Sequence, residues 1–425
     1  MAGLGLLVVL GALALGGALV RHGYDELAVG LLLILIGVTP LDALDAMLET
    51  LMASFAGARS IFLRRYVLAP GLKLVAVLAV MAGHGSVQLL AAAYLVASAA
   101  GVALYVVLLR RQLAAEGLLG RPVERTRVSV GALLGLSLPL FTTDLLLAIE
   151  TPMVVVVLER WRSTSEVAEL RAVAPVAGLC LLVLQNSKIL FRPQAARLLA
   201  RGDARGLSEL YWRSAAWMSV ATFPVFAACV FLAEPLTLWL FGPQYRQAAV
   251  LLAILAAGKY VNAALGMNTF TLQVHGRSGL VLGINALSAA LGLGLCLWLV
   301  PRHGALGGAL ATSASIVIRN ALYQGGLIAT TRVGVPPPPA ARLYGWVLGV
   351  TLALALVRAL SGDVLVLAPA VLLGALALFW SQRPYLDVLG TFPELGRVRW
   401  LGILLRAPAV DDERGDERGG ERAPL

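Results

Sequence analysis

Two basic side chains lie in the middle of apolar segments that are about as long as a lipid bilayer is thick. Lys259 and Arg319 are central in the segments 246–270 and 304–330. A charged group at that depth is costly, and it normally faces a water-filled cavity or a partner of opposite charge. A hydrated pocket with two such bases would attract a phosphate-bearing anion, because cationic side chains bind phosphate oxygens strongly.

Polar residues share the helical faces of both bases, at the spacing of three to four residues that brings side chains together on a helix. Asn262 follows the lysine by one turn. Thr312, Ser315 and Tyr323 lie on the face of the arginine. We therefore expect each base to belong to a polar stripe within its segment.

Two acidic residues occupy another apolar segment, 129–158. Asp144 and Glu150 lie between Pro139 and Pro152, where the helix is expected to bend or break. Two interpretations remain open. In the first, one of these acids neutralises one of the two bases in a structural ion pair between helices. In the second, the bases line a substrate cavity and the acids couple transport to protons or sodium ions, or line the path.

Three further acids, Asp42, Asp45 and Glu49, share one face of the segment 27–54. They are candidates for ion coupling or for ion pairs. An acidic cluster can also hold a metal ion, but no histidine lies near this one, so no metal site is expected.

Signatures of enzyme chemistry are missing from the sequence. The four histidines are far apart and lie at loop positions, and no zinc-protease, phosphate-binding-loop or nucleophile-elbow motif occurs. The three cysteines all lie inside apolar runs, where they are typically small core residues. We therefore expect no enzyme, no catalytic residue, no cofactor and no disulfide.

The composition is that of a membrane protein. Hydrophobic residues make up 59% of the chain and charged residues 14%, and the mean hydropathy is +0.84. Soluble domains carry about 25% charged residues. The formal net charge is +10, but no basic stripe is interleaved with aromatic residues, so nucleic acid is not an expected partner.

Long apolar runs without alternation predict an all-α, polytopic membrane protein of about twelve transmembrane helices. The first is read as a retained helix and not as a signal peptide. The expected segments are 3–20, 27–54, 66–83, 86–109, 129–158, 167–190, 209–232, 246–270, 277–300, 304–330, 341–360 and 363–381.

Basic residues predict the orientation of these helices. Arginine-rich connections follow the second, fourth and sixth segments, whereas the opposite connections are short and carry few bases. The positive-inside rule then places both termini in the cytoplasm. The connection 192–213 predicts a short helix, a Gly-Asp turn and the amphipathic start of the next helix, lying on the cytoplasmic leaflet. Lys73, Lys188 and Arg358 lie near segment ends, where they are expected to snorkel.

A weak internal repeat predicts two related lobes. His84-Gly85 and His303-Gly304 lie in similar turns between apolar segments, which implies a duplicated unit of roughly 220 residues. Pro301 and Gly304 are expected to end one helix, and the small residues that follow let the next pack closely. The predicted parts are an N-terminal lobe of four helices, a C-terminal lobe of six, an additional helix pair, and a basic segment with a disordered tail: 1–128, 129–331, 332–382 and 383–425. The repeat would begin about 90 residues before Met1, so two leading helices are expected to be missing.

The order and spacing of several short motifs resemble a known family. They are Leu136–Leu140, Arg171–Val176, Arg192-Pro193, Ala200–Asp203, Leu240–Ala248, Lys259–Gly266 and Val300–Ala309. The chain resembles the polysaccharide and oligosaccharide flippases (Wzx or O-antigen-transporter type) of the multidrug/oligosaccharidyl-lipid/polysaccharide exporter superfamily. The resemblance implies about fourteen helices in two lobes around a central cleft, and alternating-access transport of a polyprenyl-pyrophosphate-linked oligosaccharide across the inner membrane.

The resemblance also implies partners: the lipid bilayer, the lipid-linked oligosaccharide and a coupling proton or sodium ion, with the chain acting as a monomer. The expected substrate cavity contains Lys259, Arg319, Asn262, Asp144 and Glu150. Three alternatives stay open, namely a cation-coupled multidrug exporter, a membrane glycosyltransferase or polymerase, and a structural membrane subunit. The second would need a large outward loop with catalytic residues, and every expected outward loop is short.

Overall fold

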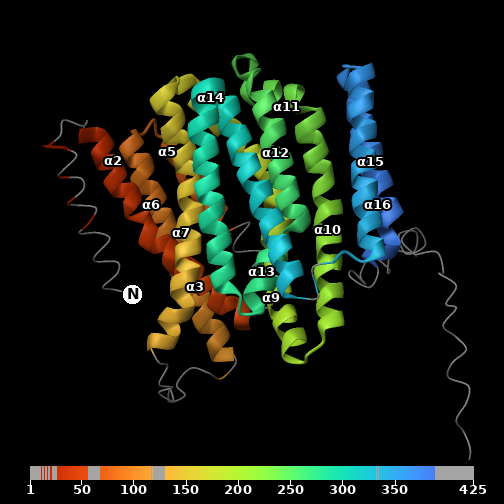
Figure 1. Cartoon of the computed structure of the whole chain (residues 1–425). Helices are drawn as coiled ribbons and strands as arrows, with labels where there is room; N and C mark the ends of the chain where they lie inside the picture. The colour runs from red at the N-terminus through yellow and green to blue at the C-terminus, as the bar shows by residue number, and fades with distance from the viewer. Residues whose placement is uncertain are drawn as a thin grey trace, which may run out of the picture. The chain divides into compact units, whose positions relative to one another are not determined.

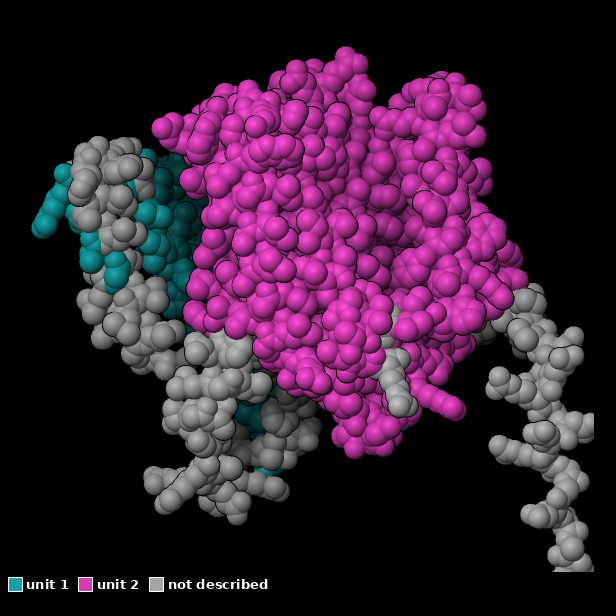
Figure 2. Space-filling model, viewed as in Figure 1, with its two compact units in different colours: residues 1–127 teal, residues 128–425 magenta. Residues whose placement is uncertain are grey.

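The computed structural model describes residues 26–55, 68–115, 130–331 and 335–387, together with single positions outside these ranges. All regular structure in these ranges is helical, which confirms the predicted all-α fold. A helix bonds every backbone N–H and C=O within its own segment, as a lipid environment requires. The chain divides into two compact units, Met1–Arg127 and Val128–Leu425, shown in teal and magenta in Figure 2. The predicted division into four parts stays a prediction.

Unit 1 contains two pairs of described helices. α6 packs against α2, α3 and α5, and its buried Tyr105 and Leu109 form a small core with Leu48 of α3. The Nζ of Lys73 donates a hydrogen bond to the hydroxyl of Tyr94 at 2.9 Å. The four helices are α2 (Glu26–Ile36), α3 (Val38–Phe55), α5 (Ala69–Ala82) and α6 (Val87–Ala115).

Unit 2 is a larger bundle in which α14 packs on α7 and α12, and α10 packs on α12 and α16 (Figure 1). Its helices are α7 (Val130–Trp161), α8 (Thr164–Gly178), η2 (Leu179–Leu181), α9 (Leu182–Ala200), α10 (Ala204–Phe231), α11 (Ala233–Phe241), η3 (Pro243–Tyr245), α12 (Ala248–Leu265), α13 (Asn268–Val274), α14 (Ser278–Thr330), α15 (Pro338–Leu360) and α16 (Val364–Leu386).

Most predicted apolar segments within the described residues fall on these helices, but three are divided: 27–54 between α2 and α3, 167–190 between α8, η2 and α9, and 246–270 between α12 and α13. Within the part of the chain that the structure describes, nine helices are long and apolar enough to cross a membrane. The predicted segment 3–20 lies almost entirely outside the described residues. The expected break between Pro139 and Pro152 is wrong, because α7 runs from Val130 to Trp161 without interruption. A proline removes one ladder hydrogen bond, and a helix packed among neighbours in a membrane tolerates that loss.

The longest helix, α14, is a hairpin of two antiparallel halves. Its 53 residues include a backbone reversal at Gly304, with φ 58° and ψ −135°. Glycine adopts this conformation easily because it has no Cβ. The halves then pack side by side, so that the hydroxyl of Tyr323 meets the side chain of Asn285 and Ser315 meets Ser288. This confirms the two predicted segments and the turn between them.

The turn between α7 and α8 clamps both sides of this reversal. The Nη2 of Arg162 donates to the carbonyl oxygen of Pro301 at 2.9 Å, at the end of the first half. The Oε2 of Glu166 accepts the backbone N–H of Ala305 at 2.7 Å, at the start of the second half. Each side chain bonds a backbone group that has no partner within its own helical half. The positive charge of Arg162 lies at a helix C-terminus and the negative charge of Glu166 at a helix N-terminus, where the helix dipole favours each of them.

The core of unit 2 has two clusters of buried side chains. In one, the ring of Phe226 on α10 stacks on Tyr260 of α12, with centroids 4.3 Å apart. In the other, Trp212 of α10 donates its Nε1–H to the carbonyl oxygen of Val333 at 2.9 Å. Small residues bring helices close together: a Cβ on Gly258 would lie 2.8 Å from the Cβ of Ser313 on α14. The packing of α12 on α14 therefore depends on the missing side chain.

The Gly-Asp turn and the start of the next helix predicted at 192–213 are present, but the separate short helix is not, because residues 192–200 continue α9 from Leu182. α9 ends at Ala200, and Gly202 turns the chain with φ 71°. Asp203 then caps α10, its Oδ1 accepting the N–H of Gly206 at 2.8 Å. Aspartate is a preferred N-cap because its carboxylate bonds a free N–H of the first turn.

Candidate functional site

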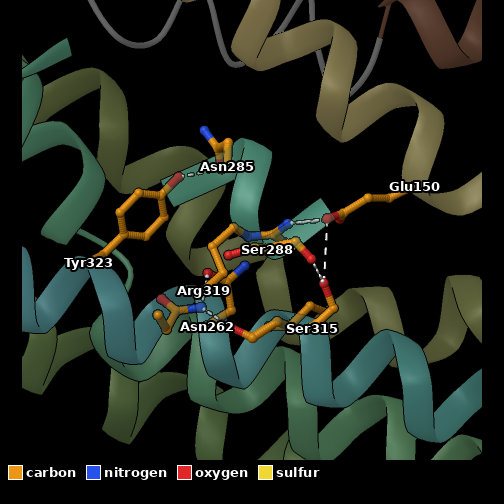
Figure 3. A network of polar contacts seen from close by, with 9 residues as sticks. Glu150, Asn262, Asn285, Ser288, Ser315, Arg319 and Tyr323 are labelled. Carbon is orange, nitrogen blue, oxygen red and sulfur yellow. Dashed lines mark hydrogen bonds and ion pairs between the residues drawn. The ribbon is translucent and has the colours of Figure 1, made fainter. Parts of the chain in front are cut away.

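An ion pair links α7 to the second half of α14. The Nη1 of Arg319 lies 2.7 Å from both carboxylate oxygens of Glu150. Ser315, one turn before the arginine, donates its hydroxyl to Glu150 Oε1 at 3.4 Å (Figure 3). The side chains of the pair are 12% and 24% exposed, so both charges are largely removed from the surroundings. The pair satisfies two charges that would each be costly alone.

Three asparagines extend this polar region towards α12 and α13. The Nδ2 of Asn320 donates to Oδ1 of Asn262 at 3.2 Å, and the Nδ2 of Asn268 donates to Oδ1 of Asn320 at 3.3 Å. Asn268 and Asn320 are fully buried. Buried amides are costly unless they are hydrogen-bonded, so these bonds hold α12, α13 and α14 in one relative position.

The first half of α14 completes the region. The hydroxyl of Tyr323 donates to Oδ1 of Asn285 at 2.5 Å, and Ser315 Oγ lies 3.3 Å from the backbone oxygen of Ser288 (Figure 3). Within the described part of the chain, Asn285 Nδ2 and Ser288 Oγ are buried and have no hydrogen-bond partner in the protein. Groups of this kind are normally satisfied by water in a folded protein. We call the set Glu150, Asn262, Asn268, Asn285, Ser288, Ser315, Arg319, Asn320 and Tyr323 the polar network.

Lys259 lies in a different environment on the same helix as Asn262. Its Nζ donates to the carbonyl oxygen of Ala174 in α8 at 2.8 Å. This carbonyl precedes Pro175, which has no N–H, and the short 3-10 stretch η2 follows. Gly178 lies next to the ammonium group, since a Cβ there would be in ordinary van der Waals contact with Nζ at 3.6 Å. Lys259 therefore binds the backbone near the end of α8, just before the helix becomes irregular at η2.

The structure brings together some of the predicted site residues and separates others. Arg319, Glu150 and Asn262 belong to the polar network, and Lys259 lies one turn from Asn262. Asp144 is exposed on α7. Burial lowers the pKa of Arg192, beyond the end of the candidate span Thr164–Lys188, and the nearby carboxylate of Asp144 acts in the opposite direction.

The acids predicted in the segment 27–54 belong to α3 of unit 1. Asp42 is exposed and Asp45 is partly buried. The side chain of Glu49 lies outside the described residues. Their role in ion coupling or ion pairing stays a prediction.

Sequence reasoning missed four members of the polar network: Asn268, Asn285, Ser288 and Asn320. A signal was present, because an asparagine within an apolar segment is costly for the same reason as a charge. Their mutual contacts depend on how α12, α13 and the halves of α14 pack, which a one-dimensional pattern does not contain.

Two pockets stand out in the described part of unit 2, and neither Lys259 nor any member of the polar network lines them. One is an apolar groove of about 380 Å³ between α10 and α16, lined by residues such as Trp217, Pro224 and Phe379. The other is a polar pocket of about 450 Å³ beside the start of α12. A cavity around Lys259 and Arg319 thus stays a prediction.

Comparison with known proteins shows the fold. No family model matches the chain, and no curated protein matches it in sequence. Among solved structures, the chain is similar to "Lipid II flippase MurJ, inward closed conformation", with a TM-score of 0.65 and 14% sequence identity over 91% of this chain and 83% of that one. The chain therefore has the fold of a polytopic membrane protein similar to a lipid II flippase.

Proposed function

We propose that the protein moves a polyprenyl-pyrophosphate-linked oligosaccharide across the cytoplasmic membrane by alternating access, for the synthesis of a cell-surface polysaccharide. The observation that carries the proposal is the likeness to a lipid II flippase over 91% of the chain. The motifs that resemble oligosaccharide flippases support the choice of an oligosaccharide. The chain is proposed to act as a monomer in the inner membrane with both termini in the cytoplasm.

In this proposal the polar region of unit 2 supplies the contacts for the pyrophosphate headgroup. The Nη1 of Arg319 contacts both carboxylate oxygens of Glu150, and a phosphate oxygen can accept the same N–H donors. A headgroup that binds Arg319 therefore competes with Glu150. Lys259 and Asn262 present an ammonium and an amide from the adjacent helix, and Asp144 lies further along α7.

Ion coupling follows from the same competition. A coupling cation beside the Glu150 carboxylate would compensate its charge and release the Arg319 guanidinium for an anionic headgroup. Departure of the cation would restore the ion pair and favour release of the headgroup.

The test is a glycan-export complementation assay with the full chain. Lys259→Ala and Arg319→Ala are expected to abolish or strongly reduce export. Arg302→Ala is the matched control, because Arg302 is exposed and its guanidinium donates within its own helix, to the Trp298 carbonyl at 2.8 Å. Because Arg319→Ala leaves Glu150 without its partner, the double variant Glu150→Gln/Arg319→Gln is included. Normal export by Lys259→Ala and by the double variant, at normal protein levels, would refute the proposal.

A cation-coupled multidrug exporter is the second candidate, favoured by the largely buried carboxylate of Glu150. An exporter of this kind needs the acid and not the bases. Glu150→Gln would then abolish drug resistance, whereas Lys259→Ala would leave it intact.

A further inference from the structure

The second pocket of unit 2 lies where α10 and α15 end and where α11 and α12 begin. It has a volume of about 450 Å³, and its charged lining consists of Glu234, Arg246 and Arg358. These helix ends are at the top of unit 2 in Figure 1. The pocket is separate from the polar network, and none of its lining residues has a part in the proposed transport.

Arg358 is held in place by the end of a neighbouring helix. Its Nη1 donates to the carbonyl oxygen of Val230 at 2.6 Å and to that of Phe231 at 3.4 Å, in the last turn of α10. A guanidinium has five N–H donors, so this contact fixes the group and leaves donors directed elsewhere. An arginine that simply extends towards water would not need such an anchor.

Two further features make the pocket electropositive. Arg246 forms an ion pair with Glu234 at 2.6 Å, yet its side chain remains 72% exposed. The three charged residues thus carry a net single positive charge. α12 also begins here, and the side chain of its N-cap residue Gln247 makes no capping hydrogen bond. The first N–H groups of a helix carry a partial positive charge that favours an anion.

Apart from Gln247, apolar side chains make up the rest of the lining, and exposed apolar side chains lie on the same helices. Val250 is part of its lining and is 57% exposed. Trp239, on the short helix α11, is 82% exposed, and Leu360 follows Arg358 by two residues and is also exposed. Tryptophan at the end of a bundle of apolar helices is typical of the boundary between membrane and water. A ligand that fits both parts has an anionic head and an apolar body.

We propose that this pocket binds the phosphate group of an anionic membrane phospholipid, with Arg246, Arg358 and the start of α12 holding the phosphate. The acyl chains lie along the apolar surface next to Val250. Glu234 weakens the site, because it competes with the phosphate for Arg246. This inference is independent of the proposed transport function.

The experiment measures lipid binding to the purified full chain in detergent. Short-chain phosphatidylglycerol is titrated and bound lipid is counted by native mass spectrometry, with phosphatidylcholine as the zwitterionic comparison. Arg246→Gln/Arg358→Gln is expected to weaken phosphatidylglycerol binding by about tenfold or more, since charge-assisted hydrogen bonds are lost. Arg302→Gln is the matched control and should bind normally.

Two more variants separate binding from folding. Glu234→Gln should bind phosphatidylglycerol about two- to fivefold more tightly, because Arg246 is released for the phosphate. A structural role of the ion pair would not produce this gain. Arg358→Lys keeps the charge, so it should retain most of the binding that Arg358→Gln loses.

The outcomes are distinct. Loss of binding in the double arginine variant, with a gain in Glu234→Gln, supports the proposal. Equal phosphatidylglycerol binding by the wild type and the double variant would overturn it. Inorganic phosphate is titrated in parallel: arginine-dependent binding of phosphate with no preference for the lipid would overturn the assignment to a phospholipid.

Discussion

Removing one member of the Glu150–Arg319 pair should destabilise unit 2 far more than removing both. Two charges about 4 Å apart attract each other by about 4 kcal/mol at an effective dielectric constant of about 20. The Nη1 of Arg319 lies 2.7 Å from both carboxylate oxygens of Glu150, and the two side chains are only 12% and 24% exposed. Loss of one partner from a buried pair therefore costs about 3–5 kcal/mol, since the other charge stays buried without compensation.

The measurement is thermal unfolding of the purified full chain in detergent. Glu150→Gln and Arg319→Gln should each lower the Tm by about 10 °C, because 1 kcal/mol corresponds to about 2–4 °C in a domain of this size. The double variant should recover most of this loss. A matched control is Arg246→Gln, which breaks an exposed pair and should cost less than about 1 kcal/mol. Additive losses in the double variant would refute the reasoning, because they would mean that neither side chain compensates the other.

Three other substitutions test contacts on which the fold depends. Gly304→Ala should destabilise the protein by about 1–3 kcal/mol in thermal unfolding, because the alanine Cβ would overlap the carboxylate of Glu166 and the backbone φ at this position is positive. An unchanged Tm would contradict the backbone conformation at Gly304. Asn320→Ala should lower the free energy of unfolding by about 1–3 kcal/mol, because the Asn320 amide joins α12 and α13 to α14. An unchanged free energy of unfolding would show that water takes over the hydrogen bonds of this amide. Gly258→Val should cost about 1–3 kcal/mol by separating α12 from α14, and a cysteine crosslink between these helices should form less readily.

Much of the fold follows from the sequence, because the bilayer allows few solutions. A spanning helix needs a long apolar run and a means of ending it. The runs around α10, α15 and α16 therefore predict those helices to within a few residues. The reversal at Gly304 is equally visible, since a proline and a glycine lie together between two apolar runs.

The contacts within the candidate site are harder to predict. Arg319 and Glu150 were each identifiable as charges within apolar runs, and pairing was one of the interpretations. Which acid pairs with which base depends on packing between helices 169 residues apart in the chain. The partner of Lys259 could not be found at all, because a backbone carbonyl such as that of Ala174 has no signature in the side-chain pattern.

The clamp formed by Arg162 and Glu166 has a mechanical consequence. Arg162, between α7 and α8, and Glu166, in the first turn of α8, are bonded to the two arms of the α14 hairpin, so these helices are tied together at this end. Bending within unit 2 must then be absorbed elsewhere along the chain. The 3-10 stretch Leu179–Leu181 is suited to act as a pivot, because the regular ladder of hydrogen bonds is already interrupted there and Lys259 holds the carbonyl of Ala174 just before it.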